Sequence, residues 1–553
     1  MAESKAQRIL IVGGVAGGAS CAARLRRMDE FAEIVVFEKG PYVSFANCGL
    51  PYHTSGVIKE EASLLLATPE KFRAQFNIDV RTHFEVTGID RAAKTVEVTN
   101  TQTGEVTTEA YDKLVLSPGA EPIRPPLPGI DLPGIFTVRT VPDARAIREW
   151  IDTKKVRRAV VIGGGFIGLE MAENLAHRGI ACTLIERLPQ VMPPADEEMV
   201  RPLQAHLREK GIDLRLETSV TGFEQRADGL VVTTDKGDVP AAGLAILAIG
   251  VKPLTDLARE AGLALNARGA IKVDEHMRTS DPDVYAIGDA VETINVVTGK
   301  PGLLPLAGPA NRQGRLVADH LAGRADARFR GVQGTSVVGV FDLTLAQTGP
   351  SERQLRAEGV ACEKAYLFPG HHVGYYPGAE PIYFKLLFAP GDGRVLGAQA
   401  VGKAGVEKRI DVIAMAIQMK ATVFDLEEAE LCYAPQYGAA KDPVNMAAFI
   451  AANHLRDESP IVHWEALETT ASRPVLLDVR NPDEIAGGVL EGTVVIPLPE
   501  LRARLGELPQ DRPLWVICGI GQRSHYAVRL LRQKGFDAYY LSGGWKMKNV
   551  LGG

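Results

Sequence analysis

The sequence predicts an α/β protein built from several domains, and three observations carry this prediction. The chain has 553 residues, which is too many for one hydrophobic core. A unit of apolar strand, glycine-rich turn, helix and second strand occurs twice, beginning near residues 8 and 158. Strands and helices alternate again after residue 463. Such alternation is typical of parallel sheets with helices packed on their faces.

Composition excludes several functional classes. Hydrophobic residues make up 46% of the chain and charged residues 24%, as in ordinary globular proteins. The net charge is −6 with acids and bases interspersed, which argues against a nucleic-acid surface. No apolar run approaches the roughly 18 residues of a membrane span, and the opening segment MAESKAQ lacks the features of a signal peptide. We therefore expect a cytoplasmic protein without a membrane span.

The first repeated unit reads RILIVGGVAGG over residues 8–18, and its second strand ends near Glu38. Glycines permit a tight turn and close backbone approach, so that a pyrophosphate can sit at the helix N-terminus. An acid at the end of the second strand accepts hydrogen bonds from a ribose. Val15 replaces the middle glycine of the usual GxGxxG pattern. The predicted contacts are Gly13, Gly14, Gly17, Gly18 and Glu38.

The second unit reads RAVVIGGGFIG over residues 158–168, and its second strand ends near Glu186. Gly163, Gly165 and Gly168 match GxGxxG in full. Two complete copies predict two Rossmann-like dinucleotide-binding domains. Glu186 favours NADH because a carboxylate would repel the 2′-phosphate of NADPH, although the adjacent Arg187 leaves NADPH open.

Two further segments resemble the pyridine nucleotide–disulfide oxidoreductase family. TSDPDVYAIGDA, residues 279–290, is similar to its second FAD motif, in which an aspartate matching Asp289 meets the ribityl–pyrophosphate region. LVLSPGAEP, residues 114–122, is similar to the strand and turn that closes the FAD domain, and it includes the predicted contact Ser117. The resemblance implies FAD at the first unit and NADH or NADPH at the second.

The six cysteines are scattered without CxxC spacing, so neither a disulfide framework nor a zinc site is expected, and no metal is predicted. Four of them are expected to be small buried hydrophobic residues. These four are Cys21, Cys182, Cys362 and Cys432.

Cys48 is the predicted catalytic residue. SFANCGLPYH, residues 44–53, closely resembles the active-site motif of coenzyme A-disulfide reductases and their NADH oxidase and persulfide reductase relatives. Most disulfide reductases of the superfamily have a second cysteine where this chain has His53, so that internal disulfide cannot form. The resemblance implies a cysteine that alternates between thiolate and a mixed disulfide with coenzyme A (CoA). We expect a following helix and a nearby flavin to favour the thiolate.

The same resemblance implies a set of CoA contacts. Arg24 stands where the family often has glutamine, and Phe76 stands where it has a lysine. For Arg24 and Arg27 a solvated helix face is an equal alternative. The implied contacts are Ser20, Arg24, Arg27, Ser44, Asn47 and Lys441.

Residues 331–450 resemble the α+β dimerisation domain of the family. HHVGYYPGAE contains Tyr375, and LCYAPQYGAAKDPVNMA contains Tyr433. The resemblance implies a homodimer in which both tyrosines approach the partner's cysteine, with Tyr433 as a hydrogen-bond or proton donor to the leaving group. Packing of both tyrosines in the core is the alternative.

The C-terminal segment resembles a rhodanese domain of α/β fold. In CGIGQRS, residues 518–524, successive N–H groups can surround an anionic sulfur, and Arg523 adds positive charge. The family usually has a histidine at Gly488. The resemblance implies that Cys518 carries sulfane sulfur as a persulfide, with an inactive scaffold as the alternative.

These segments predict four domains and a linker. They are an FAD-binding domain over 1–125 and 256–330, an NAD(P)H-binding domain over 126–255, a dimerisation domain over 331–450, a linker over 451–462 and a rhodanese domain over 463–553.

The resemblances imply an NAD(P)H-dependent reductase in which electrons pass through FAD to Cys48. The implied acceptor is CoA disulfide, CoA persulfide or polysulfide, with Cys518 supplying sulfane sulfur and sulfide released. One alternative is an NADH oxidase or peroxidase that cycles through a sulfenic acid at Cys48. Another is a sulfur-carrier protein whose flavoprotein portion is regulatory.

Overall fold

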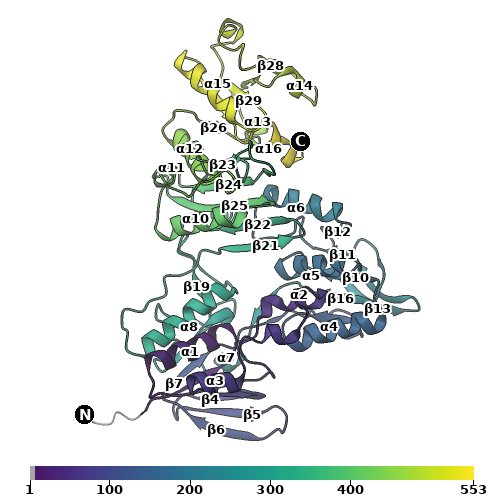
Figure 1. The fold of residues 1–553 in the computed structure, drawn as a ribbon, viewed down its shortest axis with the longest axis vertical. Coiled ribbons are helices and arrows are strands. Elements are labelled where there is room, and N and C mark those ends of the chain that lie inside the picture. The colour runs from purple at the N-terminus through teal and green to yellow at the C-terminus, as the bar shows by residue number, and fades with distance from the viewer. Residues whose placement is uncertain (1–5, 472, 553) are drawn as a thin grey trace. The chain divides into compact units, whose positions relative to one another are not determined.

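The computed structural model describes residues 6–471 and 473–552, which form two compact units (Figure 1). Unit 1 comprises Met1–Val191 and Gly211–Val332, and unit 2 comprises Met192–Lys210 and Gln333–Gly553. The predicted α/β class is confirmed, because both units combine sheets with packed helices. Among the described residues no helix has the length and apolarity that a bilayer crossing demands.

Unit 1 begins with a parallel five-stranded sheet in the order β18–β7–β1–β2–β3. Ile9, Leu10 and Ile11 of β1 are fully buried, as expected for a central strand covered on both faces. Helices α1 and α8 lie side by side. The bounds are β1 Arg8–Val12, α1 Ala16–Met28, β2 Glu33–Glu38, β3 Asp79–Thr82, β7 Lys113–Leu116, β18 Val284–Ala286 and α8 Ala307–Leu321.

Unit 1 also contains several shorter helices and strands. An antiparallel three-stranded sheet joins β4, β5 and β6. The remaining elements are α2 Leu50–Ser55, α3 Pro69–Phe76, β4 Phe84–Asp90, β5 Thr95–Asn100, β6 Val106–Ala110, α7 Asp256–Glu260, β19 Thr293–Ile294 and β20 Pro301–Gly302, with short 3-10 turns at Asn47–Gly49, Glu61–Leu64 and Gly288–Ala290.

A second parallel sheet, in the order β12–β11–β10–β16–β9, completes unit 1. It lies in the sequence between β7 and β18, which are neighbours in the first sheet. The bounds are β8 Ala120–Pro122, β9 Ile135–Thr137, α4 Val141–Lys154, β10 Arg158–Ile162, α5 Phe166–His177, β11 Ala181–Ile185, β12 Asp213–Arg215, β13 Val220–Arg226, β14 Gly229–Thr234, β15 Val239–Ala242, β16 Leu244–Leu247 and β17 Val251–Pro253.

Unit 2 contains an antiparallel sheet in the order β21–β22–β25–β24–β23, with α10 and α12 packed against it. Every residue of β25 is buried. The bounds are α6 Glu197–Glu209, β21 Ser336–Val340, β22 Leu343–Thr348, α9 Glu352–Ala357, β23 Glu363–Leu367, β24 Tyr383–Phe388, β25 Val395–Gly402, α10 Val406–Gln418, α11 Val423–Glu427 and α12 Pro443–Leu455.

A parallel sheet in the order β26–β30–β29–β27–β28 forms the C-terminal part of unit 2. It carries the yellow end of the chain in Figure 1. The bounds are β26 Ile461–Val462, α13 Ala466–Thr469, β27 Val475–Asp478, α14 Pro482–Ile485, β28 Val494–Val495, a 3-10 turn Leu505–Glu507, β29 Leu514–Ile517, α15 Gln522–Gln533, β30 Ala538–Leu541 and α16 Gly544–Leu551.

The packing of two segments differs from the predicted domain bounds. Helix α6 falls within the expected NAD(P)H-binding segment, yet it packs against β22 and β25 of unit 2. The expected linker over 451–462 is largely ordered, since α12 continues through the buried Ala451 and Ala452 and β26 begins at Ile461. Both differences arise from long-range packing. The other domain bounds stay predictions.

Candidate functional site

The first glycine turn admits no larger side chain at its two tightest positions. Gly13 has φ +91°, and a Cβ there would lie 2.1 Å from the Ser117 carbonyl oxygen. A Cβ on Gly18 would lie 1.9 Å from the Gly13 carbonyl oxygen. The Glu38 carboxylate accepts hydrogen bonds from the backbone N–H groups of Gly14 and Gly40, at 2.9 and 2.8 Å. The turn therefore brings backbone N–H groups and an acid together, as dinucleotide binding requires.

A cavity of about 500 Å³ extends from this turn. Its lining includes Gly17, Ser117 and Asp289, three of the predicted cofactor contacts. Burial raises the pKa of Asp289. Asn47, the neighbour of Cys48, lines the same cavity. The cavity and its glycine cradle fit a dinucleotide, and one part of the lining belongs to the loop of Cys48.

The second glycine turn repeats the first in detail. A Cβ on Gly168 would lie 1.8 Å from the carbonyl oxygen of Gly163, which has φ +107°. The Glu186 carboxylate accepts from the N–H groups of Gly164 and Leu188, at 2.7 and 2.8 Å. A Cβ on Gly165 would meet no atom within 4 Å, so this glycine leaves room beside the helix N-terminus. The geometry fits a second dinucleotide.

Cys48 is exposed in the short 3-10 turn that precedes α2, and its Sγ lies 3.7 Å from Asn47 Oδ1. The protein side chains around Cys48 act against the expected thiolate. Partial burial of the thiol raises the pKa of Cys48, and the carboxylates of Glu170 and Asp289 raise it further. The backbone hydrogen bond of the turn acts in the opposite direction and is the weaker effect.

The predicted CoA contacts of unit 1 fall into two groups. Ser44, which has φ +48°, and Asn47 lie in the loop before Cys48. Ser20 and Arg24 lie along the seam between α1 and α8, where the Ser20 hydroxyl bonds to the amide of Asn311.

Arg24 is not a free cation. Its Nε lies 2.6 Å from Asp319 Oδ1, and Arg324 binds the other oxygen of Asp319 at 3.0 Å. Arg27 is exposed, as the solvated alternative requires. No motif connects Asp319 to Arg24, almost three hundred positions earlier, so the sequence does not predict this ion pair.

The tyrosine pair of unit 2 lies on the surface rather than in the core. The side chains of Tyr375 and Tyr433 are 75% and 45% exposed, and their hydroxyl oxygens lie 2.8 Å apart. Packing in the core is therefore wrong as an alternative for this pair. Lys441, on the segment that follows Tyr433, is also exposed.

The four other cysteines divide into two classes. Cys21 and Cys182 are buried, as expected, and burial raises the pKa of each thiol to about 12. The expectation is wrong for Cys432, which is exposed, and for Cys362, which is half-buried. Cys362 immediately precedes β23, and Cys432 lies in the loop between α11 and α12.

Cys518 is buried at the end of β29, where its loop bends into α15. The Gly521 N–H donates to Cys518 Sγ at 3.1 Å. The Arg523 guanidinium binds the Glu484 carboxylate. Glu484 raises the pKa of Arg523, and Cys518 raises it by a smaller amount. Gly488 has φ +124°, a conformation that explains a glycine there. The loop thus places an N–H donor at the sulfur, and Arg523 beside it is paired with Glu484.

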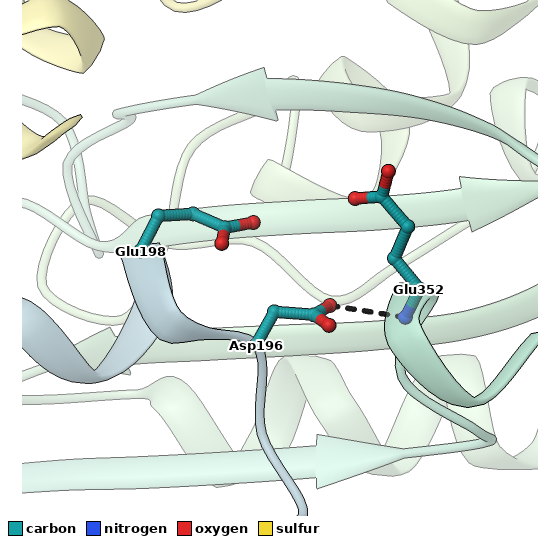
Figure 2. Close-up of side chains that lie close together, drawn as sticks. All are labelled: Asp196, Glu198 and Glu352. Atoms are coloured by element: carbon teal, nitrogen blue, oxygen red, sulfur yellow. Dashed lines mark hydrogen bonds between the residues drawn. The ribbon is translucent and has the colours of Figure 1, made fainter. Parts of the chain in front are cut away.

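Unit 2 also contains a buried group of carboxylates. Figure 2 shows Asp196, Glu198 and Glu352 around one space, with the Glu352 N–H donating to Asp196 at 3.1 Å. The ammonium of the fully buried Lys385 lies 2.8, 2.6 and 2.7 Å from these three carboxylates. The lysine therefore supplies the positive charge at this position.

Glu352 of this group also takes part in contacts that connect the two sheets of unit 2. Lys364 Nζ bridges Glu352 and Glu465 at 3.2 and 2.7 Å, and Glu465 lies between β26 and α13. The backbone N–H of Tyr366 donates to Ser542 Oγ, just after β30. The C-terminal sheet is therefore held against β23 by buried polar contacts.

Two dinucleotide folds in one unit, with a single exposed cysteine beside the first, define an oxidoreductase of the flavoprotein class. The chain belongs to the pyridine nucleotide-disulphide oxidoreductase family, whose model matches residues 7–314. The model of that family's dimerisation domain matches residues 335–442, and that of the rhodanese-like domain matches residues 462–547. The predicted family is thus confirmed.

Relatives of known name cover most of the chain. Coenzyme A disulfide reductase of Staphylococcus epidermidis is 37% identical over 80% of this chain and 99% of its own length. The structure of reduced Bacillus anthracis CoADR-RHD matches with a TM-score of 0.96 and 46% identity, covering 99% of this chain and 98% of that one. The NAD-dependent persulfide reductase from A. fulgidus matches with a TM-score of 0.89 and 38% identity, covering 98% and 99%.

Proposed function

We propose that this protein is an NAD(P)H-dependent reductase of CoA disulfide and CoA persulfide that works through Cys48. The observation that carries the proposal is an exposed cysteine with His53 in place of a second thiol, next to a cavity that begins at a dinucleotide turn. The names of the relatives from Staphylococcus epidermidis and A. fulgidus support this substrate class.

The residues of unit 1 bind and orient two cofactors. The N–H groups after Gly13 receive the pyrophosphate of FAD, and Glu38 receives its ribose. The turn at Gly163 and the acid Glu186 do the same for NAD(P)H, and the carboxylate favours NADH. FAD, when bound, supplies two-electron transfer from the nicotinamide to a sulfur–sulfur bond.

Cys48 performs the sulfur chemistry in two steps. Its thiolate attacks CoA–S–S–R, so that Cys48–S–S–CoA forms and R–S⁻ leaves. Two electrons then cleave the mixed disulfide into Cys48–S⁻ and CoA–S⁻. With CoA persulfide as substrate the leaving group is hydrosulfide. Because His53 cannot share the oxidation, the small thiol stays bound to Cys48 until the electrons arrive.

A homodimer completes the site in this proposal. The exposed Tyr375–Tyr433 pair faces the cysteine of a second copy, where a phenolic hydroxyl donates a hydrogen bond to the leaving sulfur. The match to a dimerisation-domain model supports such an assembly. Lys441 and the Ser44–Asn47 loop contact CoA.

The rhodanese-like domain supplies sulfane sulfur. Cys518 persulfide transfers its outer sulfur to CoA thiolate, giving CoA–S–S⁻ and Cys518–S⁻. The N–H of Gly521 and the charge of Arg523 stabilise the anionic sulfur before transfer. This step makes CoA persulfide the substrate that links the two cysteines.

The test is an anaerobic NADH-oxidation assay with CoA disulfide, CoA persulfide and polysulfide, with sulfide measured in parallel. We expect turnover with both CoA substrates and sulfide release from the persulfide. Turnover with oxygen or peroxide alone, with Cys48 oxidised to sulfenic acid, would instead establish an oxidase. Sulfur transfer that needs neither NADH nor Cys48 would establish a sulfur carrier.

A further inference from the structure

The start of α16 packs directly against the loop of Cys518. The backbone N–H of Trp545 donates to the Cys518 carbonyl oxygen at 2.8 Å. The N–H of Lys546 donates to the Gly519 carbonyl oxygen at 2.9 Å. Gly544 has φ +58°, and a Cβ there would lie 2.4 Å from the Cys518 carbonyl oxygen. The first N–H groups of a helix have no intrahelical partner, and here they bind the loop that carries the sulfur.

These two hydrogen bonds also set the direction of the donors in the loop. The C=O and N–H of one trans peptide unit point in opposite directions. Because the carbonyl groups of Cys518 and Gly519 face α16, the N–H groups of Gly519 and Ile520 point away from that helix. The next N–H, that of Gly521, donates to Cys518 Sγ at 3.1 Å. The arrangement of donors around the sulfur therefore depends on the position of α16.

Lys546 connects the same turn of α16 to the antiparallel sheet of unit 2. Its ammonium lies 4.9 Å from the ring centre of Phe368, directly after β23, and 4.6 Å from that of Tyr383, at the start of β24. The two rings meet edge to face with their centres 5.1 Å apart. Burial lowers the pKa of Lys546, and no carboxylate of the described residues offsets this effect. Aromatic rings therefore hold this cation.

The residues before α16 fit closely against the same sheet. Gly543 has φ +72°, and a Cβ there would lie 3.1 Å from Phe368 Cε2 and 3.2 Å from Tyr366 Cβ. The Tyr366 N–H donates to Ser542 Oγ at 3.1 Å. The antiparallel sheet thus contacts the start of α16 from one side, and the Cys518 loop contacts it from the other residues of the same turn.

We propose that Lys546 is a positioning residue for sulfane-sulfur transfer, which holds the start of α16 against the Cys518 loop by binding two aromatic rings of the antiparallel sheet. The proposal rests on the sulfur-carrying role proposed above for Cys518. Lys546 acts on the sulfur through the position of α16. The segment matched by the dimerisation-domain model thereby takes part in the sulfur chemistry of the rhodanese-like domain.

The experiment measures transfer of sulfane sulfur from polysulfide to CoA by the full chain without NADH, with CoA persulfide trapped by iodoacetamide. The rate of Cys518→Ala is subtracted as the uncatalysed background. Lys546→Met keeps the apolar stem and removes the cation, so kcat should fall about fivefold while the KM for polysulfide stays the same. A Lys546→Met enzyme with the wild-type kcat would overturn the proposal.

Two variants separate this contact from a general effect of charge on α16. Lys548→Met removes the neighbouring lysine, whose ammonium lies 4.9 Å from the Trp545 ring within the rhodanese-like domain, and it should transfer sulfur at the wild-type rate. Lys546→Arg restores a cation that stacks on aromatic rings, so most of the transfer should return. Equal losses in the two methionine variants, or no recovery with arginine, would contradict the proposal.

A double-mutant cycle tests the aromatic partner. Phe368→Leu should lower kcat as Lys546→Met does, and the double variant should lose little more than either single variant, because both changes break one contact. Fully additive losses would contradict the proposal. Reduction of CoA disulfide through Cys48 is the control for folding, and each variant should retain it.

The wild type separates this proposal from the one on which it rests. A wild-type enzyme that transfers no more sulfur than Cys518→Ala would refute the role proposed for Cys518 and, with it, the role of Lys546. Wild-type transfer that Lys546→Met reproduces in full would refute the role of Lys546 alone.

Discussion

The two reactive cysteines lie in opposite electrostatic surroundings. Cys48 is exposed, and the charged groups that act on it are the carboxylates of Glu170 and Asp289. Cys518 is buried and accepts a hydrogen bond from the Gly521 N–H at 3.1 Å. It also raises the pKa of Arg523. Carboxylates act on the first sulfur, and a backbone N–H donor contacts the second.

This difference fits the two roles proposed above, which are release of a thiolate at Cys48 and storage of sulfane sulfur at Cys518. At Cys48 burial and the carboxylates disfavour the thiolate, so in the proposed function the mixed disulfide forms at a site that opposes negative charge. At Cys518 the Gly521 N–H donates to the sulfur, so in the proposed function a hydrogen bond holds the persulfide until an acceptor arrives. We therefore expect that Cys518 cannot replace Cys48 in disulfide reduction. We likewise expect that Cys48 cannot replace Cys518 in sulfane-sulfur transfer.

The largest effect is expected from Cys48→Ser. The variant should lose NADH-dependent reduction of CoA disulfide by at least about 1000-fold, because serine cannot form the mixed disulfide. The steady-state rate at saturating NADH measures this loss. Transfer of sulfane sulfur to cyanide by Cys518 serves as the control and should not change. Retained CoA-disulfide turnover would contradict the separate roles proposed for Cys48 and Cys518.

Cys518→Ala should have a smaller and more selective effect. Sulfide release with polysulfide and CoA should fall about tenfold or more, because the persulfide donor is lost. Reduction of preformed CoA disulfide should continue at the wild-type rate, since Cys48 and both glycine turns are untouched. Parallel assays of NADH and sulfide measure both quantities. Equal losses in the two reactions would show that the sites are not separate.

The smallest effect is a difference in pH dependence. Arg523 lowers the pKa of Glu484 to about 2, so this pair's contribution is complete above the ordinary carboxyl range and is lost only as the pH falls toward 2. Burial raises the pKa of Glu170 to about 7, and the ionised carboxylate raises the pKa of Cys48. Cys518 sulfur transfer should therefore show no step from Glu484 between pH 5 and 8, whereas Cys48 alkylation should show one near 7. Stopped-flow pH profiles of the two reactions measure this contrast, and a shared step would contradict it.

Short-range patterns predicted the parts of the site that are themselves short-range. The turns at Gly13 and Gly163 could be recognised because a Cβ in either turn would collide with a carbonyl oxygen. The Cys518 loop was recognisable because the cysteine, glycines and arginine are contiguous. The residue roles assigned to these motifs stay predictions.

Long-range packing decided what the sequence could not. Asp319 neutralises Arg24 from another helix, and Glu170 of the second dinucleotide fold accepts a hydrogen bond from Tyr52, just after Cys48. Helix α6 joins unit 2 through Lys385, whose buried ammonium binds Asp196 and Glu198. Each contact joins segments that no local pattern relates, so neither periodicity nor a motif could signal it.

The central claim is that one sulfur, without a neighbouring thiol, carries the oxidation as a mixed disulfide. The direct measurement is anaerobic incubation of reduced holoenzyme with CoA disulfide, followed by mass spectrometry of peptides prepared without reductant. The account predicts CoA attached to the Cys48 peptide and its loss after addition of NADH. NADH consumption by an enzyme that never carries CoA on Cys48 would contradict it.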